Sequence, residues 1–123
     1  MKKLLGIIFT AALLTPLFSQ ARPVKVRFYD GGGFNSIFFT QDFRGGDMTT
    51  QMLMLGQTEE HQFDLQDPIY MGSAYLRVGP GLYNVECPAP NDGAAMPDNV
   101  NVIEIVSYGP AWSGRCSVHY KAE

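Results

Sequence analysis

Short stretches of alternating apolar and polar residues, separated by glycine and proline, recur along this chain. In residues 24–28, three apolar side chains alternate with Lys25 and Arg27. A two-residue period of this kind is typical of a strand with one buried face and one face in water. Together with the other β-prone runs, this segment makes about eight expected strands, at residues 24–28, 36–40, 49–55, 61–65, 74–78, 82–87, 100–108 and 115–120. Short, regularly spaced strands without a long helix predict an all-β protein, a small antiparallel β-sandwich of Greek-key-like topology.

Two of the expected strands carry more specific predictions. Residues 49–55 lack β-branched side chains after their two threonines, so a short helix remains an alternative, although no helical spacing continues past Gly56. We favour a strand there. Residues 100–108 are β-branched on both faces, which is typical of a central strand covered on both sides.

The first 21 residues have the features of a secretory signal peptide. Two lysines precede an apolar run over residues 4–14, and Ser19 and Ala21 occupy the −3 and −1 positions of a cleavage site. A membrane anchor would need about 20 consecutive apolar residues, and a Thr-Pro pair interrupts this run. We therefore predict a secreted or periplasmic protein whose mature chain, residues 22–123, forms one domain without a membrane span.

The predicted mature chain is acidic. The whole chain has 9 Lys and Arg against 12 Asp and Glu, and the leader removes two of the lysines, which leaves 7 against 12 and a formal charge of −5. The remaining basic residues are scattered along the chain rather than clustered. Such a surface repels phosphate backbones, so we exclude nucleic acid as a partner.

Two cysteines, Cys87 and Cys116, remain in a chain expected to be exported. Oxidising compartments favour their pairing. Each cysteine also shares its strand face with apolar neighbours, which predicts a buried disulfide between the sixth expected strand and the last. Two unpaired thiols are the alternative. The spacing is not that of a CxxC motif, and no cluster of histidine and cysteine accompanies the pair, which argues against redox catalysis and structural zinc.

Three consecutive glycines, residues 31–33, lie between the first two expected strands. A phosphate-binding loop would require a following Gly-Lys-Ser/Thr and the start of a helix, and neither is present. We therefore expect these glycines to form a backbone corner.

The segment KVRFYDGGGFNS, residues 25–36, resembles the first Greek-key motif of the βγ-crystallin superfamily. In that motif an aromatic residue is followed after four residues by another, here Tyr29 and Phe34, and then by a small residue and a glycine. The segment SAYLRVGPG, residues 73–81, is similar to the strand before the family's second motif. The resemblance implies a folded hairpin with a structural role for its glycines. Ser36 stands where the family has glycine, and the family's calcium signature is absent, so the resemblance implies no calcium ligand here.

Catalytic motifs are absent from the sequence. His61 has Glu59, Glu60 and Asp64 nearby, which could form a metal cluster, but we interpret the run as a solvated strand entry. We interpret His119 as a surface histidine. No GxSxG or comparable nucleophile motif is present. We predict no enzyme activity, no metal and no cofactor, although two carboxylates brought together by folding remain an alternative.

Two loops are the candidates for recognition: residues 87–99, and residues 108–116, which carry the single tryptophan. Because the expected disulfide lies at both loop bases, it would reduce the entropy lost on binding. The candidate contact residues are Met96, Tyr108 and Trp112, with packing of Trp112 on the core as the alternative. We predict a non-catalytic module that binds an extracytoplasmic protein or glycan. The alternatives are an inhibitor of an exported hydrolase and a small secreted enzyme.

Overall fold

A computed structural model describes residues 21–79 and 83–123 of the chain. The predicted leader therefore lies outside the described residues, except for Ala21, which begins the first strand. The described residues form seven strands and two short 3-10 helices, and they contain no α-helix. The elements are β1 (Ala21–Asp30), β2 (Ser36–Gln41), β3 (Thr58–Gln66), β4 (Ser73–Val78), β5 (Tyr83–Cys87), η1 (Pro90–Gly93), β6 (Val102–Tyr108), η2 (Ala111–Ser113) and β7 (Arg115–Lys121).

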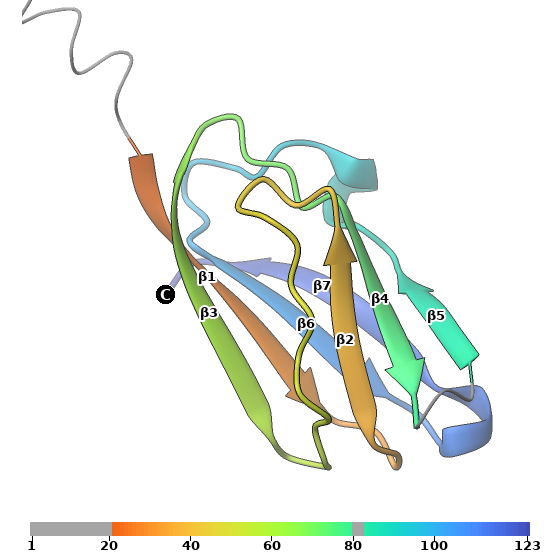
Figure 1. The fold of residues 1–123 in the computed structure, drawn as a ribbon. Helices are drawn as coiled ribbons and strands as arrows, with labels where there is room; N and C mark the ends of the chain where they lie inside the picture. The colour runs from red at the N-terminus through yellow and green to blue at the C-terminus, as the bar shows by residue number, and fades with distance from the viewer. Residues whose placement is uncertain (1–20, 80–82) are drawn as a thin grey trace, which may run out of the picture.

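The strands form two sheets that face each other, which confirms the predicted β-sandwich (Figure 1). One sheet has the order β3-β1-β6-β7 and the other has the order β2-β4-β5. Four of the five strand pairs are antiparallel, as expected, but β1 and β6 are parallel, with Phe28 opposite Ile105. Alternation of side chains cannot reveal this, because it is the same for both pairing directions.

The core lies between the sheets and is built from the predicted inward faces. Val24, Val26 and Phe28 of β1 are fully buried, as are Phe38 of β2 and Leu76 of β4. The rings of Phe28 and Phe38 lie 5.5 Å apart and connect the two sheets. The polar residues between the buried positions of β1 point outward, as their alternation predicts.

The prediction of a strand at residues 49–55 is wrong. Only two isolated bridges form there, between Phe39 and Thr49 and between Ser36 and Leu53. Threonine side chains replace part of the expected ladder. The Phe38 N–H donates to Thr50 Oγ1 at 3.0 Å, and the Met48 N–H donates to the hydroxyl of a β2 threonine at 2.9 Å. Side-chain hydrogen bonds of this kind compete with regular pairing, which explains why seven strands form instead of about eight.

The run at residues 100–108 contains the central strand β6, as predicted, because β6 pairs with β1 on one side and β7 on the other. The prediction that both faces are covered is only partly correct. Ile103 and Ile105 are fully buried on the inner face, and on the outer face Val102 is buried whereas Glu104 and Val106 are half-buried. Charged side chains from neighbouring strands, rather than another layer of the fold, shield that face.

The predicted disulfide between Cys87 and Cys116 is confirmed, with an S–S distance of 2.02 Å. Cys87 ends β5, and Cys116 lies near the start of β7. These are edge strands of different sheets, so the buried bond joins the two layers of the sandwich.

The three glycines form the predicted backbone corner. They carry the chain from β1 in one sheet to β2 in the other, so these two strands do not form a hairpin. The Gly31 N–H donates to the Ser107 carbonyl at 2.9 Å, and the Gly33 N–H donates to the Gly109 carbonyl at 3.0 Å. A Cβ on Gly32 would lie 2.7 Å from the Phe34 ring, so a larger residue would force that ring to move.

Within residues 21–79 and 83–123, the structure contains no helix of the length and apolarity needed to cross a bilayer.

Candidate functional site

Three segments that are distant in sequence meet at one end of the sandwich, drawn at the bottom of Figure 1. They are residues 31–35 between β1 and β2, residues 51–57 before β3, and residues 109–114 between β6 and β7. We call them together the loop end. The bond from Gly33 to Gly109 connects the first and third segments. A cavity of about 310 Å³, lined by residues 33–35 with Met54 and Leu55, lies between the first and second.

The loop end contains no Asp, Glu, Lys or Arg in any of its three segments. The segments at the opposite end, residues 42–48, 67–72 and 88–101, carry five acidic residues and one arginine. The three loop-end segments are therefore uncharged, with Glu59 and Arg115 next to them, whereas the segments of the opposite end are acidic. An uncharged surface can be removed from water at a lower desolvation cost than a charged one.

Large apolar side chains project from the loop end into solvent. Trp112 is 85% exposed, Leu55 is 67% exposed and Met54 is 57% exposed. Tyr108, at the end of β6, is also exposed. Single exposed apolar residues are common, but several on adjoining uncharged segments mark a candidate contact surface.

The loop that carries Trp112 is held at both of its bases. The Tyr83 hydroxyl of β5 donates to the Ala111 carbonyl at 2.7 Å and accepts from the Gly114 N–H at 2.8 Å. Gly109 has a φ of +92°, which favours glycine. The disulfide follows two residues after Gly114. Trp112 is thus presented on a constrained loop, and little ordering entropy would be lost when it binds.

The structure separates the three predicted contact residues. Trp112 and Tyr108 are exposed at or beside the loop end, so the alternative that Trp112 packs on the core is wrong. Met96 is only 4% exposed, belongs to the hydrophobic core and lies in the loop at the opposite end. We therefore do not keep Met96 as a contact residue. Its loop is instead tied to β1, where the Arg22 guanidinium donates to carbonyls that include those of Met96 and Val100.

Sequence reasoning missed Met54 and Leu55. Both lie in the run that the sequence predicts to be a strand, in which alternate residues would be buried. The structure buries Leu53 but exposes Met54 and Leu55 at the turn before β3. The signal was the sequence MLML directly before Gly56, an apolar run next to a turn residue.

Neither histidine forms a recognisable catalytic or metal site. His61 lies within β3, opposite the inward-facing Val26, rather than at the strand entry as expected, and its side chain is 35% exposed. Its ring is edge-on to Phe28, and its Nε2 is 2.7 Å from a Glu59 oxygen. His119 is exposed on β7, as predicted, with Nε2 2.8 Å from Ser117 Oγ. Across the described ranges, no three His, Cys, Asp or Glu residues are grouped so that they could hold a metal ion.

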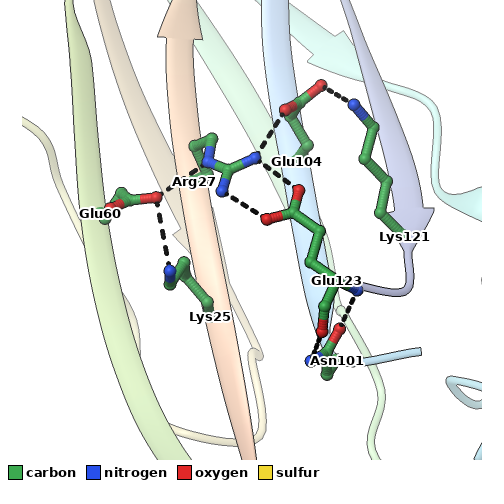
Figure 2. A network of polar contacts seen from close by, with 7 residues as sticks. All are labelled: Lys25, Arg27, Glu60, Asn101, Glu104, Lys121 and Glu123. Carbon is green, nitrogen blue, oxygen red and sulfur yellow. Dashed lines mark hydrogen bonds and ion pairs between the residues drawn. The ribbon is translucent and has the colours of Figure 1, made fainter. Parts of the chain in front are cut away.

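A charged network covers the outer face of the four-stranded sheet (Figure 2). Arg27 of β1 is at its centre and donates to Glu60 at 2.8 Å, to both Glu123 oxygens at 2.8 and 2.9 Å, and to Glu104 at 3.2 Å. Lys121 contacts Glu104 at 2.8 Å. The hydrogen bond from Lys121 is the main reason that the pKa of Glu104 lies below its usual value. The hydrogen bonds from Arg27 are the main reason that the pKa of Glu123 is also lowered. The bonds from Arg27 attach residue 123 to β1. Because the positive and negative charges of the network compensate one another, little net charge remains to bind a ligand.

One ionisable side chain lies beneath the loop end. Asp30, the last residue of β1, is fully buried. Its Oδ1 accepts hydrogen bonds from the Gly32 N–H at 3.0 Å and from Ser107 Oγ at 3.1 Å. Burial raises the pKa of Asp30, and these hydrogen bonds only partly oppose the shift.

The sequence matches no protein-family model and no curated protein. Among solved structures, the chain is similar to pneumolysin from Streptococcus pneumoniae, with a TM-score of 0.49 and 13% identity over 84% of this chain. It is also similar to a structure described as the membrane-binding domain of pneumolysin (TM-score 0.48, 14% identity, 83% of this chain and 100% of that chain). A third similar structure is listeriolysin O (TM-score 0.42, 10% identity, 84% of this chain and 23% of that chain). The chain spans about a quarter of the length of the whole toxins (24% of pneumolysin). At these identities and TM-scores, the similarity establishes no family for this chain.

Proposed function

We propose that this protein is a non-catalytic binding module that acts outside the cytoplasm and contacts another macromolecule through its loop end. The observation that carries this proposal is the 85% exposure of Trp112 on a loop held at both bases. Keeping such a side chain in water forgoes the free energy of burying it, about 25 cal/mol per Å² of apolar area. A partner that covers the loop end would recover that free energy.

The partner that we favour is an extracytoplasmic protein. Tryptophan is enriched among the residues that dominate protein interfaces, and Leu55 and Met54 expose further apolar area at the same end of the sandwich. A glycan is the other partner in this proposal. It fits less well, because Asn35 and Ser113 are among the few side chains of these segments that could bond to sugar hydroxyls.

A lipid surface is a second candidate, favoured by one specific observation. The three segments of the loop end carry no charged residue, so placing them at a membrane interface would cost less free energy than placing charged loops there. Tryptophan is also enriched at membrane–water interfaces. The acidic end of the molecule would then face away from the lipid.

The experiment uses the mature chain in two arms. In the first, the immobilised protein captures partners from extracellular or periplasmic fractions. In the second, neutral phosphatidylcholine vesicles are titrated into the protein while tryptophan emission is recorded, which reports on Trp112 alone because the chain has 1 Trp. A blue shift with co-sedimentation identifies the lipid surface. Saturable capture of a protein without a response to vesicles identifies the protein partner.

Variants decide whether the loop end is the contact surface. Trp112→Ala should weaken binding by about 2 kcal/mol or more, roughly 30-fold in Kd, and Leu55→Ala should weaken it in the same direction. Tyr70→Ala is the matched control, because Tyr70 is 47% exposed in a segment of the opposite, acidic end. Normal binding by both loop-end variants, or equal loss in the Tyr70 control, would show that the proposal is wrong.

A further inference from the structure

Asp30 is an unfavourable residue for the position that it occupies. It is 0% exposed between the two sheets, and its Oδ2 has no hydrogen-bond partner. Burying a carboxyl group in an apolar core costs free energy unless all of its polar atoms are paired. An apolar residue here would continue the buried face formed by Val26 and Phe28 without that cost. A buried polar group that is only partly paired in a native structure calls for an explanation.

The hydrogen bonds of Asp30 offer an explanation for its burial, because they connect it to two segments of the loop end. Its Oδ1 accepts from the Gly32 N–H in the first segment. Its backbone carbonyl accepts from the Gly56 N–H in the second segment at 2.7 Å, and its own N–H donates to the Gln57 carbonyl at 3.1 Å.

Two buried serines extend the connection to the third segment. Ser107 Oγ donates to Asp30 Oδ1, and Ser107 lies near the end of β6, just before the loop of Trp112. Ser107 Oγ is also 3.2 Å from Ser36 Oγ. The backbone of Ser36 in turn exchanges hydrogen bonds with Leu53 at 2.9 and 2.7 Å, next to the exposed Met54 and Leu55. The Asp30–Ser107–Ser36 cluster therefore joins all three segments from beneath.

We propose that Asp30 is a positioning residue for the loop end, which holds residues 31–35, 51–57 and 109–114 in the arrangement that exposes Trp112 and Leu55 at the same end of the sandwich. The importance of this arrangement for binding rests on the proposed function. The arrangement itself can be measured without any partner.

The test compares Asp30→Ala with Asp30→Asn by hydrogen–deuterium exchange of the free mature protein. Alanine removes the acceptor for Gly32 and Ser107, whereas the asparagine carbonyl oxygen can replace Oδ1. In Asp30→Ala, the amides of Gly31, Gly33 and Gly56 should exchange at least about 10-fold faster than in the wild type. Asp30→Asn should restore most of the protection. The Met96 amide, which bonds to Ile69 at the acidic end, is the internal control and should not change.

Three results would overturn the inference. The loop-end amides could keep wild-type exchange rates in Asp30→Ala, amides at both ends could accelerate equally, or Asp30→Asn could behave like Asp30→Ala. If Asp30→Ala does not fold, Ser107→Ala replaces it. This variant removes one of the two bonds to Oδ1 and should accelerate exchange at the loop end only; unchanged exchange would equally overturn the inference.

The same variants separate this inference from the proposed function. If the exchange result is as expected but no protein or vesicle binds to the loop end, only the proposed function fails. If Trp112→Ala abolishes binding but Asp30→Ala leaves both exchange and binding unchanged, only the positioning role fails.

Discussion

Loss of the Cys87–Cys116 bond should lower the free energy of unfolding by about 3.6 kcal/mol. The two cysteines are 29 residues apart, and they join edge strands of different sheets. In the chain-entropy model, closing a loop of this length removes roughly 12 cal/mol/K from the unfolded ensemble, which gives the quoted value at 25 °C. Since small domains are stable by about 5–15 kcal/mol, this bond supplies a large share of the total.

Reduction of the wild-type protein is the cleanest perturbation, because it opens the loop without removing atoms from the core. Urea unfolding of oxidised and reduced protein should be followed by far-UV circular dichroism. Tryptophan emission is a poor probe of unfolding here, since Trp112 is already 85% exposed in the folded state. The midpoint should fall on reduction, and the m-value should rise because the reduced unfolded chain exposes more surface.

The control is the double variant Cys87→Ala, Cys116→Ala, whose unfolding should not respond to reductant. Its stability should lie below that of reduced wild type, because both cysteine side chains are buried and alanine leaves small cavities. If oxidised and reduced wild type unfold with free energies within about 1 kcal/mol of each other, the loop-closure reasoning is wrong. Packing between the sheets would then hold β5 and β7 together without the bond.

Three further outcomes are expected. The Lys121 ammonium group holds the pKa of Glu104 below its usual value. The ionised Glu104 therefore stabilises the fold above the usual glutamate pKa, and this stabilisation is lost as the pH falls through the lowered pKa. Glu104→Gln should flatten the acid side of a curve of unfolding free energy against pH. Burial raises the pKa of Asp30, so the pH dependence has the opposite sign. The contribution of Asp30 to the unfolding free energy is complete below the usual aspartate pKa and is lost as the pH rises through the raised pKa. Asp30→Asn should remove this loss of stability at higher pH. His61→Ala and His119→Ala should bind a loop-end partner as the wild type does, and loss of binding in either would favour a histidine-containing site.

The loop end shows where prediction from sequence stops. Trp112 could be named as a candidate because aromatic residues on constrained loops are frequent contact residues. The same reasoning predicts Met96 as a contact residue, but Met96 is buried, because a loop sequence does not show which of its side chains turns into the core. The exposure of Leu55 could not be predicted either. In the structure, the pairing of this segment ends at the bridge between Ser36 and Leu53, and Leu55 lies in the turn that follows.

The sequence by itself determined which face of each regular strand is buried, because side-chain direction alternates along any strand. It also determined the pairing of the cysteines and the corner at the three glycines. Only the tertiary structure decided that β1 pairs with β6 in parallel, and that residues 31–35, 51–57 and 109–114 meet at one end above Asp30. These features depend on contacts between segments far apart in the chain, and a local pattern of apolar and polar residues does not specify which segments become neighbours.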